Sequence, residues 1–180
     1  MKVLIDACVL YPTVLRELVL GTAAQGLFTP LWSDRILEEW RRAALRKSAP
    51  DGVIAEGEIA RLRVQFPKAG VEGSDQTQAT LYLPDENDIH VLAAAIDGGA
   101  EALLTLNTKD FPLRTLGAHG ILRRHPDEFL LEAARLDRDG LARLANEVLG
   151  EAGNHGIDVS NPRALMKRAQ VPRFGKFLYP

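Results

Sequence analysis

Short apolar runs and helical repeats alternate along the chain. Residues 2–5 (KVLI) and 102–106 (ALLTL) are nearly continuous apolar runs, which is typical of strands buried in a parallel sheet. After Pro12, apolar side chains recur at the spacing of a helix. Ser33 is placed to cap a second helix that runs to about Lys47. The pattern therefore switches from strand to helix and back.

The rest of the chain continues this alternation. The further helices that we expect cover about 53–66, 84–96, a segment from 126 and 139–150. Short strands are expected near 27–29, 70–73 and 120–122. Pro50-Asp51-Gly52 indicates a break ahead of the helix at 53. Strands that alternate with helices predict an α/β fold with a mostly parallel sheet, whose active sites gather at the carboxyl ends of the strands.

The composition narrows the class of protein. The 180 residues are 46% apolar and 26% charged, as expected for one compact domain or for one domain with a short appendage. No apolar run reaches the length of a membrane span, and we do not expect a secretory signal. Cys8 is the single cysteine, which excludes a disulfide framework and a Cys-rich zinc site. We expect a cytoplasmic protein.

The formal charge of −2 argues against binding nucleic acid by bulk electrostatics alone. The charge is nevertheless unevenly spread, because the residues after Asp158, the last acidic residue, form a tail with only basic charges. Its five basic side chains are Arg163, Lys167, Arg168, Arg173 and Lys176. Because aromatic residues are interleaved with them, the tail is a candidate contact for RNA or for an acidic partner segment. The alternative is a solvated tail with packed aromatics.

Four carboxylates fall at strand ends and helix starts. Asp6 directly follows the first strand, and Asp110 lies just past 102–106. Asp88 is in the first turn of a predicted helix, on its apolar face, where an unpaired carboxylate is costly. Glu39 flanks the apolar stripe of the helix that Ser33 caps. The sequence thus predicts that these acids meet at one edge of the sheet.

Structural roles are the alternative for each of these acids. Asp6 and Asp110 suit turns or caps, and Asp85 with Asp88 resembles a capping box. Glu39 could instead pair with arginines of its own helix.

Other polar residues near these acids have less specific signals. Helical geometry turns Glu38 away from the site and His90 away from the apolar face, so we expect both at the surface. Thr105 and Asn107 end the strand before Asp110. They would orient water or phosphate, or simply satisfy the backbone of the loop.

Carboxylates crowded at one place need a counter-charge. Mg²⁺ and Mn²⁺, which prefer oxygen ligands, supply it, and a pair of such ions held by carboxylates is suited to hydrolysing phosphodiesters. A Gly-rich phosphate loop, a GxSxG elbow and an HExxH pair are all missing. Their absence weakens the interpretations as an NTPase, a serine hydrolase or a zinc protease.

The segments that carry the acids resemble those of the PIN-domain ribonuclease family, in its branch of VapC-like toxin components of toxin–antitoxin pairs. The likeness rests on VLIDACVLYP at 3–12, WSDRILEEWRR at 32–42, LPDENDIHVLAAAI at 83–96, LLTLNTKDFP at 103–112 and HPDEFLLE at 125–132. The four acids of the family match Asp6, Glu39, Asp88 and Asp110 here. Asn107 and Ser33 match accessory positions of the family, and Asp85 and Thr105 are further accessory candidates from their places in the sequence. Cys8 stands where many members have asparagine, which loses a possible hydrogen bond.

The resemblance implies a three-layer α/β/α sandwich with bound Mg²⁺ or Mn²⁺ that cleaves single-stranded RNA. It also implies an antitoxin partner and a homodimer. We expect the nuclease domain at 1–132 and a helical extension with the basic tail at 133–180.

Two other functions compete with a nuclease. A phosphoacceptor receiver-like module would also use strand-end aspartates, but it predicts a second acid beside Asp6, where Ile5 and Ala7 stand. It also predicts a lysine after the last strand, whereas Lys109 adjoins Asp110 itself. The second alternative is a catalytically inactive RNA- or protein-binding domain of the same fold.

Overall fold

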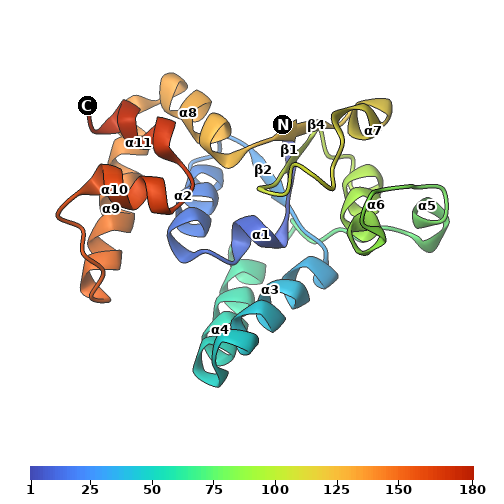
Figure 1. Ribbon diagram of the computed structural model, residues 1–180, viewed down its shortest axis with the longest axis horizontal. Helices are drawn as coiled ribbons and strands as arrows, with labels where there is room; N and C mark the ends of the chain where they lie inside the picture. The colour runs from blue at the N-terminus through green and yellow to red at the C-terminus, as the bar shows by residue number, and fades with distance from the viewer. The chain divides into compact units, whose positions relative to one another are not determined.

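A computed structural model describes residues 1–180, which form two compact units (Figure 1). The first unit contains Met1–Tyr11 and Thr29–Arg123, and the second contains Pro12–Phe28 and Arg124–Pro180. The strands are β1 (Lys2–Ile5), β2 (Thr29–Leu31), β3 (Ala102–Leu104) and β4 (Leu122–Arg124). The helices accompanying them in the first unit are α1 (Ala7–Leu10), α3 (Asp34–Lys47), α4 (Ala49–Gln65), α5 (Asp75–Gln78), the 3₁₀ helix η1 (Glu86–Asp88), α6 (Ile89–Asp97) and α7 (Leu113–Ala118).

The sheet has the strand order β2-β1-β3-β4. The central strand β1 pairs in parallel with both neighbours, and Val3 lies opposite Pro30 of β2 and Ala102 of β3. Val3, Leu4 and Ile5 are fully buried, as are the three residues of β3, because helices cover a parallel sheet on both faces. Pro30 is tolerated because β2 is an edge strand. The predicted α/β class with a parallel sheet is confirmed.

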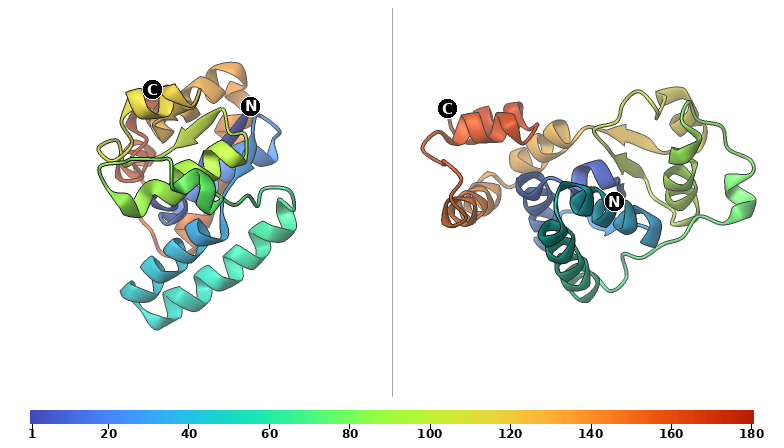
Figure 2. Two further views of the ribbon diagram at one scale, coloured as in Figure 1. Left: turned by 90° about the vertical axis from the view of Figure 1, so that its right-hand side faces the viewer. Right: turned by 60° about the horizontal axis from the view of Figure 1, so that its bottom comes forward.

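Helices α3 and α4 form a hairpin that is clear in Figure 2. The Ser33 hydroxyl accepts the Ile36 N–H at 3.2 Å and caps α3, and the Ser48 hydroxyl accepts the Asp51 N–H at 3.1 Å and caps α4. Our expected break at residues 50–52 is therefore wrong. Proline is tolerated in the first turn of a helix, where its missing N–H has no helical partner, so the helix begins before the Pro-Asp-Gly sequence.

Two other expected elements differ in detail. Residues 70–73 make a single bridge, from Gly70 to Trp32, rather than a strand. The helix expected over 84–96 starts as η1 before it continues as α6. The second difference is at a helix end, where the last or first turn is often 3₁₀.

The second unit is helical. Its elements are α2 (Thr13–Ala24), α8 (Pro126–Leu136), α9 (Arg138–Asn154), α10 (Pro162–Arg168) and α11 (Pro172–Leu178). Helix α2 packs on α8 and α9, and the rings of Phe28 and Phe129 meet edge to face, 5.0 Å between centroids. The carboxylate of Asp127, which is buried, accepts the backbone N–H groups of Arg173 and Phe174 at 3.1 and 2.9 Å. The tail is thereby held on α8.

The basic tail is folded rather than extended. Phe174 is fully buried, Phe177 and Tyr179 are partly covered, and the five basic side chains are exposed. The compact units join residues 12–28 to the C-terminal helices, so they differ from a division at residue 132; the bounds 1–132 and 133–180 of the nuclease domain and its extension remain a prediction. None of the helices combines the length and apolarity needed to cross a membrane.

Candidate active site

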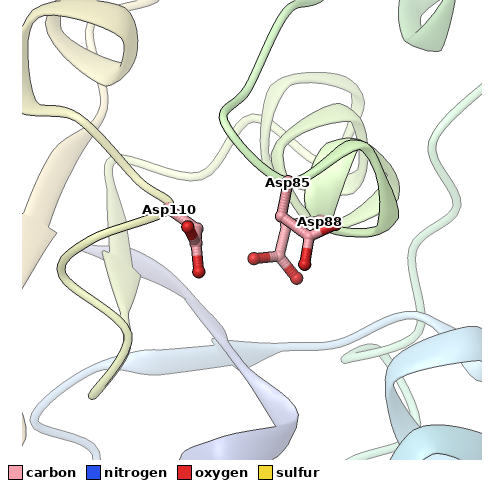
Figure 3. A group of neighbouring side chains, drawn as sticks. All are labelled: Asp85, Asp88 and Asp110. Carbon is pink, nitrogen blue, oxygen red and sulfur yellow. The ribbon is translucent and has the colours of Figure 1, made fainter.

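Three aspartates meet beside the carboxyl ends of β1 and β3. Carboxylate oxygens of Asp85, Asp88 and Asp110 all lie within 4.8 Å of one another. Figure 3 shows Asp85 and Asp88, from the start of the η1–α6 segment, facing Asp110 on the loop after β3. Three negative charges thus occupy a volume that suits one or two small cations.

Local structure decides which of these acids is available. Asp85 caps η1, because its Oδ1 accepts the Asn87 N–H at 2.9 Å. Asp88 makes no side-chain capping bond to α6, so the capping-box alternative does not account for its position. Its Oδ2 accepts instead from Asn107 Nδ2 at 3.1 Å. Asp88 therefore faces the acidic cluster with one oxygen already held in place.

Asp6 is fixed from two sides at the end of β1. Its Oδ2 accepts the Thr105 hydroxyl at 2.6 Å and lies 3.0 Å from Cys8 Sγ. Burial, followed by the charge of Asp6, raises the pKa of the Cys8 thiol to about 12, so the thiol stays protonated and donates to the carboxylate. Cys8 thus keeps a hydrogen bond to the site, and the loss expected from the sequence is wrong.

The loop that carries Asp110 is braced from within the first unit. Asn107 Oδ1 accepts the Asp110 N–H at 3.3 Å, and Thr105 Oγ1 accepts the Asn107 N–H at 2.9 Å. Arg123 donates to the carbonyl oxygens of Thr108 and Phe111 at 2.7 and 2.8 Å. Thr105 and Asn107 therefore connect the carboxylates to the loop backbone.

Glu39 reaches the site from α3, and Glu38 does not. Glu38 pairs with Arg41 and Arg42 on the outer face of α3, at 2.7 Å in each case. Glu39 lies 3.5 Å from Arg35 Nε and 2.8 Å from His90 Nε2. The structure thus places Glu39 toward the site and Glu38 away from it, as the helical geometry of the sequence predicted.

His90 is buried, with 5% of its surface exposed, so its expected surface position is wrong. Helix α6 is buried on all sides from His90 to Ala95, and a helical-wheel argument fails for such a helix because it has no solvent face. Neither ring nitrogen makes a hydrogen bond. The short contact with Glu39 lies outside hydrogen-bonding directions, although its distance is that of an ion pair.

Burial and the neighbouring negative charges make Asp88 harder to ionise. Burial and then the charges of Asp6, Asp85, Asp110 and Glu39 raise the pKa of Asp88 from its ordinary value of 3.8 to about 6. The three other predicted acids, together with Asp85, therefore act on the carboxyl group of Asp88. Such a group is stabilised in its charged form by a cation, and the all-oxygen donor set fits a hard divalent ion such as Mg²⁺ or Mn²⁺.

Ser33 has a structural position. It is buried and caps α3, and it is not among the residues that line the pocket next to the acids. That pocket, of about 370 Å³, shares Glu39 and Asp88 with the site and extends past Tyr11, Ala43 and Arg46. The sequence did not point to Tyr11 or Arg46, which line this pocket, or to the burial of His90 beside Glu39. It predicted an accessory role for Asp85, which is one of the three aspartates whose carboxylates lie within 4.8 Å of one another.

The parallel sheet and the acids at its carboxyl edge define an α/β domain with a carboxylate centre. Residues 2–109, more than half of the chain, match the PIN domain family. The chain belongs to this family, and the three-layer α/β/α fold implied by the resemblance is confirmed.

Among curated proteins, the chain is similar to "Putative ribonuclease VapC50" of Mycobacterium tuberculosis. The two are 35% identical over 89 residues, which cover 48% of this chain and 51% of that protein. The chain thus spans about half the length of this relative. No solved structure matches the chain.

Proposed function

We propose that this protein is a metal-dependent endoribonuclease that cleaves phosphodiester bonds of single-stranded RNA. The observation that carries the proposal is the approach of Asp85, Asp88 and Asp110 within 4.8 Å of one another. Membership of the PIN domain family and the name of the curated relative support the same activity. Asp6, Glu39, Asp88 and Asp110 are the proposed catalytic and metal-binding acids, and Asp85 is an additional candidate ligand.

The chain's own residues hold and orient these acids. Thr105 and Cys8 fix Asp6, Asn107 fixes Asp88, and Arg123 braces the loop of Asp110. When bound, Mg²⁺ or Mn²⁺ would neutralise the phosphate and activate water for attack on phosphorus. The unscreened acids repel an RNA phosphate, so cation binding and substrate binding should be coupled.

The decisive experiment is cleavage of a panel of single-stranded RNAs, with DNA strands of the same sequences alongside. Addition of EDTA should abolish cleavage, and Mg²⁺ or Mn²⁺ added in excess should restore it. The Asp88→Asn protein, purified in parallel, controls for contaminating ribonucleases. Equal cleavage by this variant, or cleavage that persists in EDTA, would refute the proposed mechanism. Failure of the wild type to cleave any strand would favour the inactive binding domain.

We further propose that the protein is the toxin component of a toxin–antitoxin pair that acts in the cytoplasm, with an antitoxin protein and a second copy of the chain as partners. The family resemblance and the relative support this role. Induced expression of the wild type should arrest growth, and expression of Asp88→Asn should not. The receiver-like alternative is not favoured, because the chain matches the PIN domain.

A further inference from the structure

The pocket beside the acids is lined by groups that the cleavage chemistry does not require. Its walls include Tyr11, at the end of α1, and Ala43 and Arg46 of α3, while Glu39 and Asp88 form the side shared with the catalytic centre. A volume of about 370 Å³ is in the range of small-ligand sites. The pocket therefore has room for part of a substrate beyond the reacting phosphate.

Arg46 differs from the other basic residues of α3. Arg35, Arg41, Arg42 and Lys47 each pair with a nearby carboxylate, whereas no ion pair or hydrogen bond engages Arg46. Its side chain is exposed and lines the pocket. A cation without an internal partner is available to an anion from outside the protein.

The spacing along α3 relates Arg46 to the acids. Glu39, Ala43 and Arg46 are separated by four and then three residues, so they share one face of the helix. A rise of 1.5 Å per residue puts about 10 Å between Glu39 and Arg46 along the axis. A strand with one phosphate at the acids would have a neighbouring phosphate within reach of Arg46. Glu39 and Asp88 form the acidic end of the pocket, next to the cations that the reaction would use. Arg46 forms its basic end, where a neighbouring phosphate of the strand would lie.

Tyr11 supplies an aromatic surface between these ends. Its side chain is 38% exposed, and Ala43 adds a small apolar wall to the same pocket. Aromatic faces stack on nucleic-acid bases with little preference for sequence. A free acidic peptide would satisfy Arg46 but would leave the ring and the shared acidic wall unexplained, so RNA is the better occupant.

We propose that this pocket is a subsite for the nucleotide next to the cleaved phosphate, with Tyr11 stacking on the base and Arg46 pairing with a phosphate. The inference rests on the proposed nuclease activity, because it assumes that the scissile phosphate lies at the acids. It adds a binding element that acts on RNA affinity rather than on the chemical step. Its consequences are thus separable from those of the acids.

The test measures RNA binding apart from cleavage. Anisotropy of a labelled short RNA strand is recorded over a range of salt concentrations in Ca²⁺, which neutralises the acids, and a gel run after each titration verifies that the strand is intact. Arg46→Gln should bind several-fold more weakly, and its log–log salt dependence should be shallower by about 0.7, the value for one phosphate contact on a single strand. Tyr11→Leu should lose about fivefold or more in affinity with an unchanged salt slope, and Tyr11→Phe should bind like the wild type.

A matched control is Arg114→Gln, which removes one exposed and unpaired arginine of α7 that does not line the pocket. It should behave as the wild type. Equal binding by Arg46→Gln and Arg114→Gln would overturn the proposal, as would equal losses in Tyr11→Phe and Tyr11→Leu. Thermal melts verify the fold of each variant, and if Tyr11→Leu is unfolded, Arg46→Gln decides.

Cleavage kinetics on the same proteins separate the two proposals. If the wild type cleaves RNA in Mg²⁺, the subsite variants should raise KM and leave kcat nearly unchanged. A wild type that binds RNA through Tyr11 and Arg46 but does not cleave it would refute the nuclease and keep the binding pocket. A wild type that cleaves while both variants retain its KM would refute the subsite alone.

Discussion

Asp88 connects the electrostatics of single residues to stability. Its pKa is raised to about 6 in the folded protein, chiefly by burial and then by the neighbouring acids. The folded state therefore holds the proton more tightly than the unfolded state, and ionisation of Asp88 opposes folding. This cost is absent below the ordinary pKa of about 4 and is complete above about pH 6.

We predict that Asp88→Asn melts at a higher temperature than the wild type at pH 7 in EDTA, because it removes an uncompensated charge. The difference should shrink as the pH falls from 6 to 4, where Asp88 of the wild type becomes neutral. Cleavage by the variant should fall by at least about a hundredfold, since the loss of groups that merely support a metal ligand already costs 10–100-fold. Melting curves over this pH range check the sign, and a lower melting temperature at pH 7 would contradict it.

The two adjacent glutamates of α3 provide a matched comparison. Glu39→Gln should reduce cleavage strongly, because Glu39 adjoins the acidic cluster and lines its pocket. Glu38→Gln breaks only pairs with Arg41 and Arg42 that are in part accessible to solvent, so activity and melting temperature should change little. Cleavage rates of the two variants at saturating Mg²⁺ decide the assignment. A greater loss of cleavage in Glu38→Gln than in Glu39→Gln would show that Glu38 is the working carboxylate and that our assignment to Glu39 is wrong.

The buried ring of His90 should lower the stability of the fold, so its presence beside Glu39 suggests a role in the site. Its two ring nitrogens are buried without hydrogen bonds, and unsatisfied buried polar groups oppose folding. We predict that His90→Leu retains or raises the melting temperature but lowers kcat, because Glu39 loses the ring 2.8 Å away that limits its position. The control is His119→Leu, which alters an exposed histidine. Unchanged kcat in His90→Leu would leave the ring without a role in positioning Glu39.

At the scale of elements, Arg123 links the strand β4 to the loop that carries Asp110. Its guanidinium donates to two loop carbonyls, and hydrogen bonds to charged groups contribute about 1.5–3 kcal/mol each. Part of this is lost to solvent, so we predict that Arg123→Gln costs about 1–2 kcal/mol in unfolding free energy. Cleavage should fall further than this loss of stability explains, because Asp110 moves with the loop. Urea unfolding and kcat, compared with Arg114→Gln, test both effects.

The elements also show what a sequence can predict. The apolar runs at 2–5 and 102–106 identified the two central strands, because strands buried on both faces require such runs. An acid directly after such a strand must lie at the carboxyl edge of the sheet, and Asp6 is an example. Pro50 led to the wrong prediction of a break at residues 50–52, because proline disrupts the interior of a helix but suits its first turn.

The remaining features of the site depend on contacts between distant segments. His90 is buried because surrounding elements enclose α6 completely, and no pattern within α6 itself reveals this. Arg46 is distinguished only by the pairing of its neighbours on α3. Periodicity within one helix gives the direction of a side chain but not what faces it, so such residues emerge only from tertiary structure.

At the scale of the whole chain, the basic tail combines a structural part and a charged part. Phe174 and Met166 are fully buried, and Asp127 binds the backbone at Arg173 and Phe174. Deleting residues 163–180 would therefore expose apolar surface and remove the partners of a buried carboxylate. Truncation should lower the melting temperature, so it does not isolate what the charges do.

Neutralising charges while keeping the helices is the cleaner change. Arg173 pairs with Glu128 and Arg168 donates to the Asp158 carbonyl, which leaves Arg163, Lys167 and Lys176 exposed and unpaired. We predict that the triple glutamine variant of these three keeps the melting temperature but binds single-stranded RNA more weakly. Its salt slope should be shallower by about 2 if all three contact phosphates. Unchanged RNA binding with weaker antitoxin binding would assign the tail to the partner protein, and no change in either would make its charges a solvated surface.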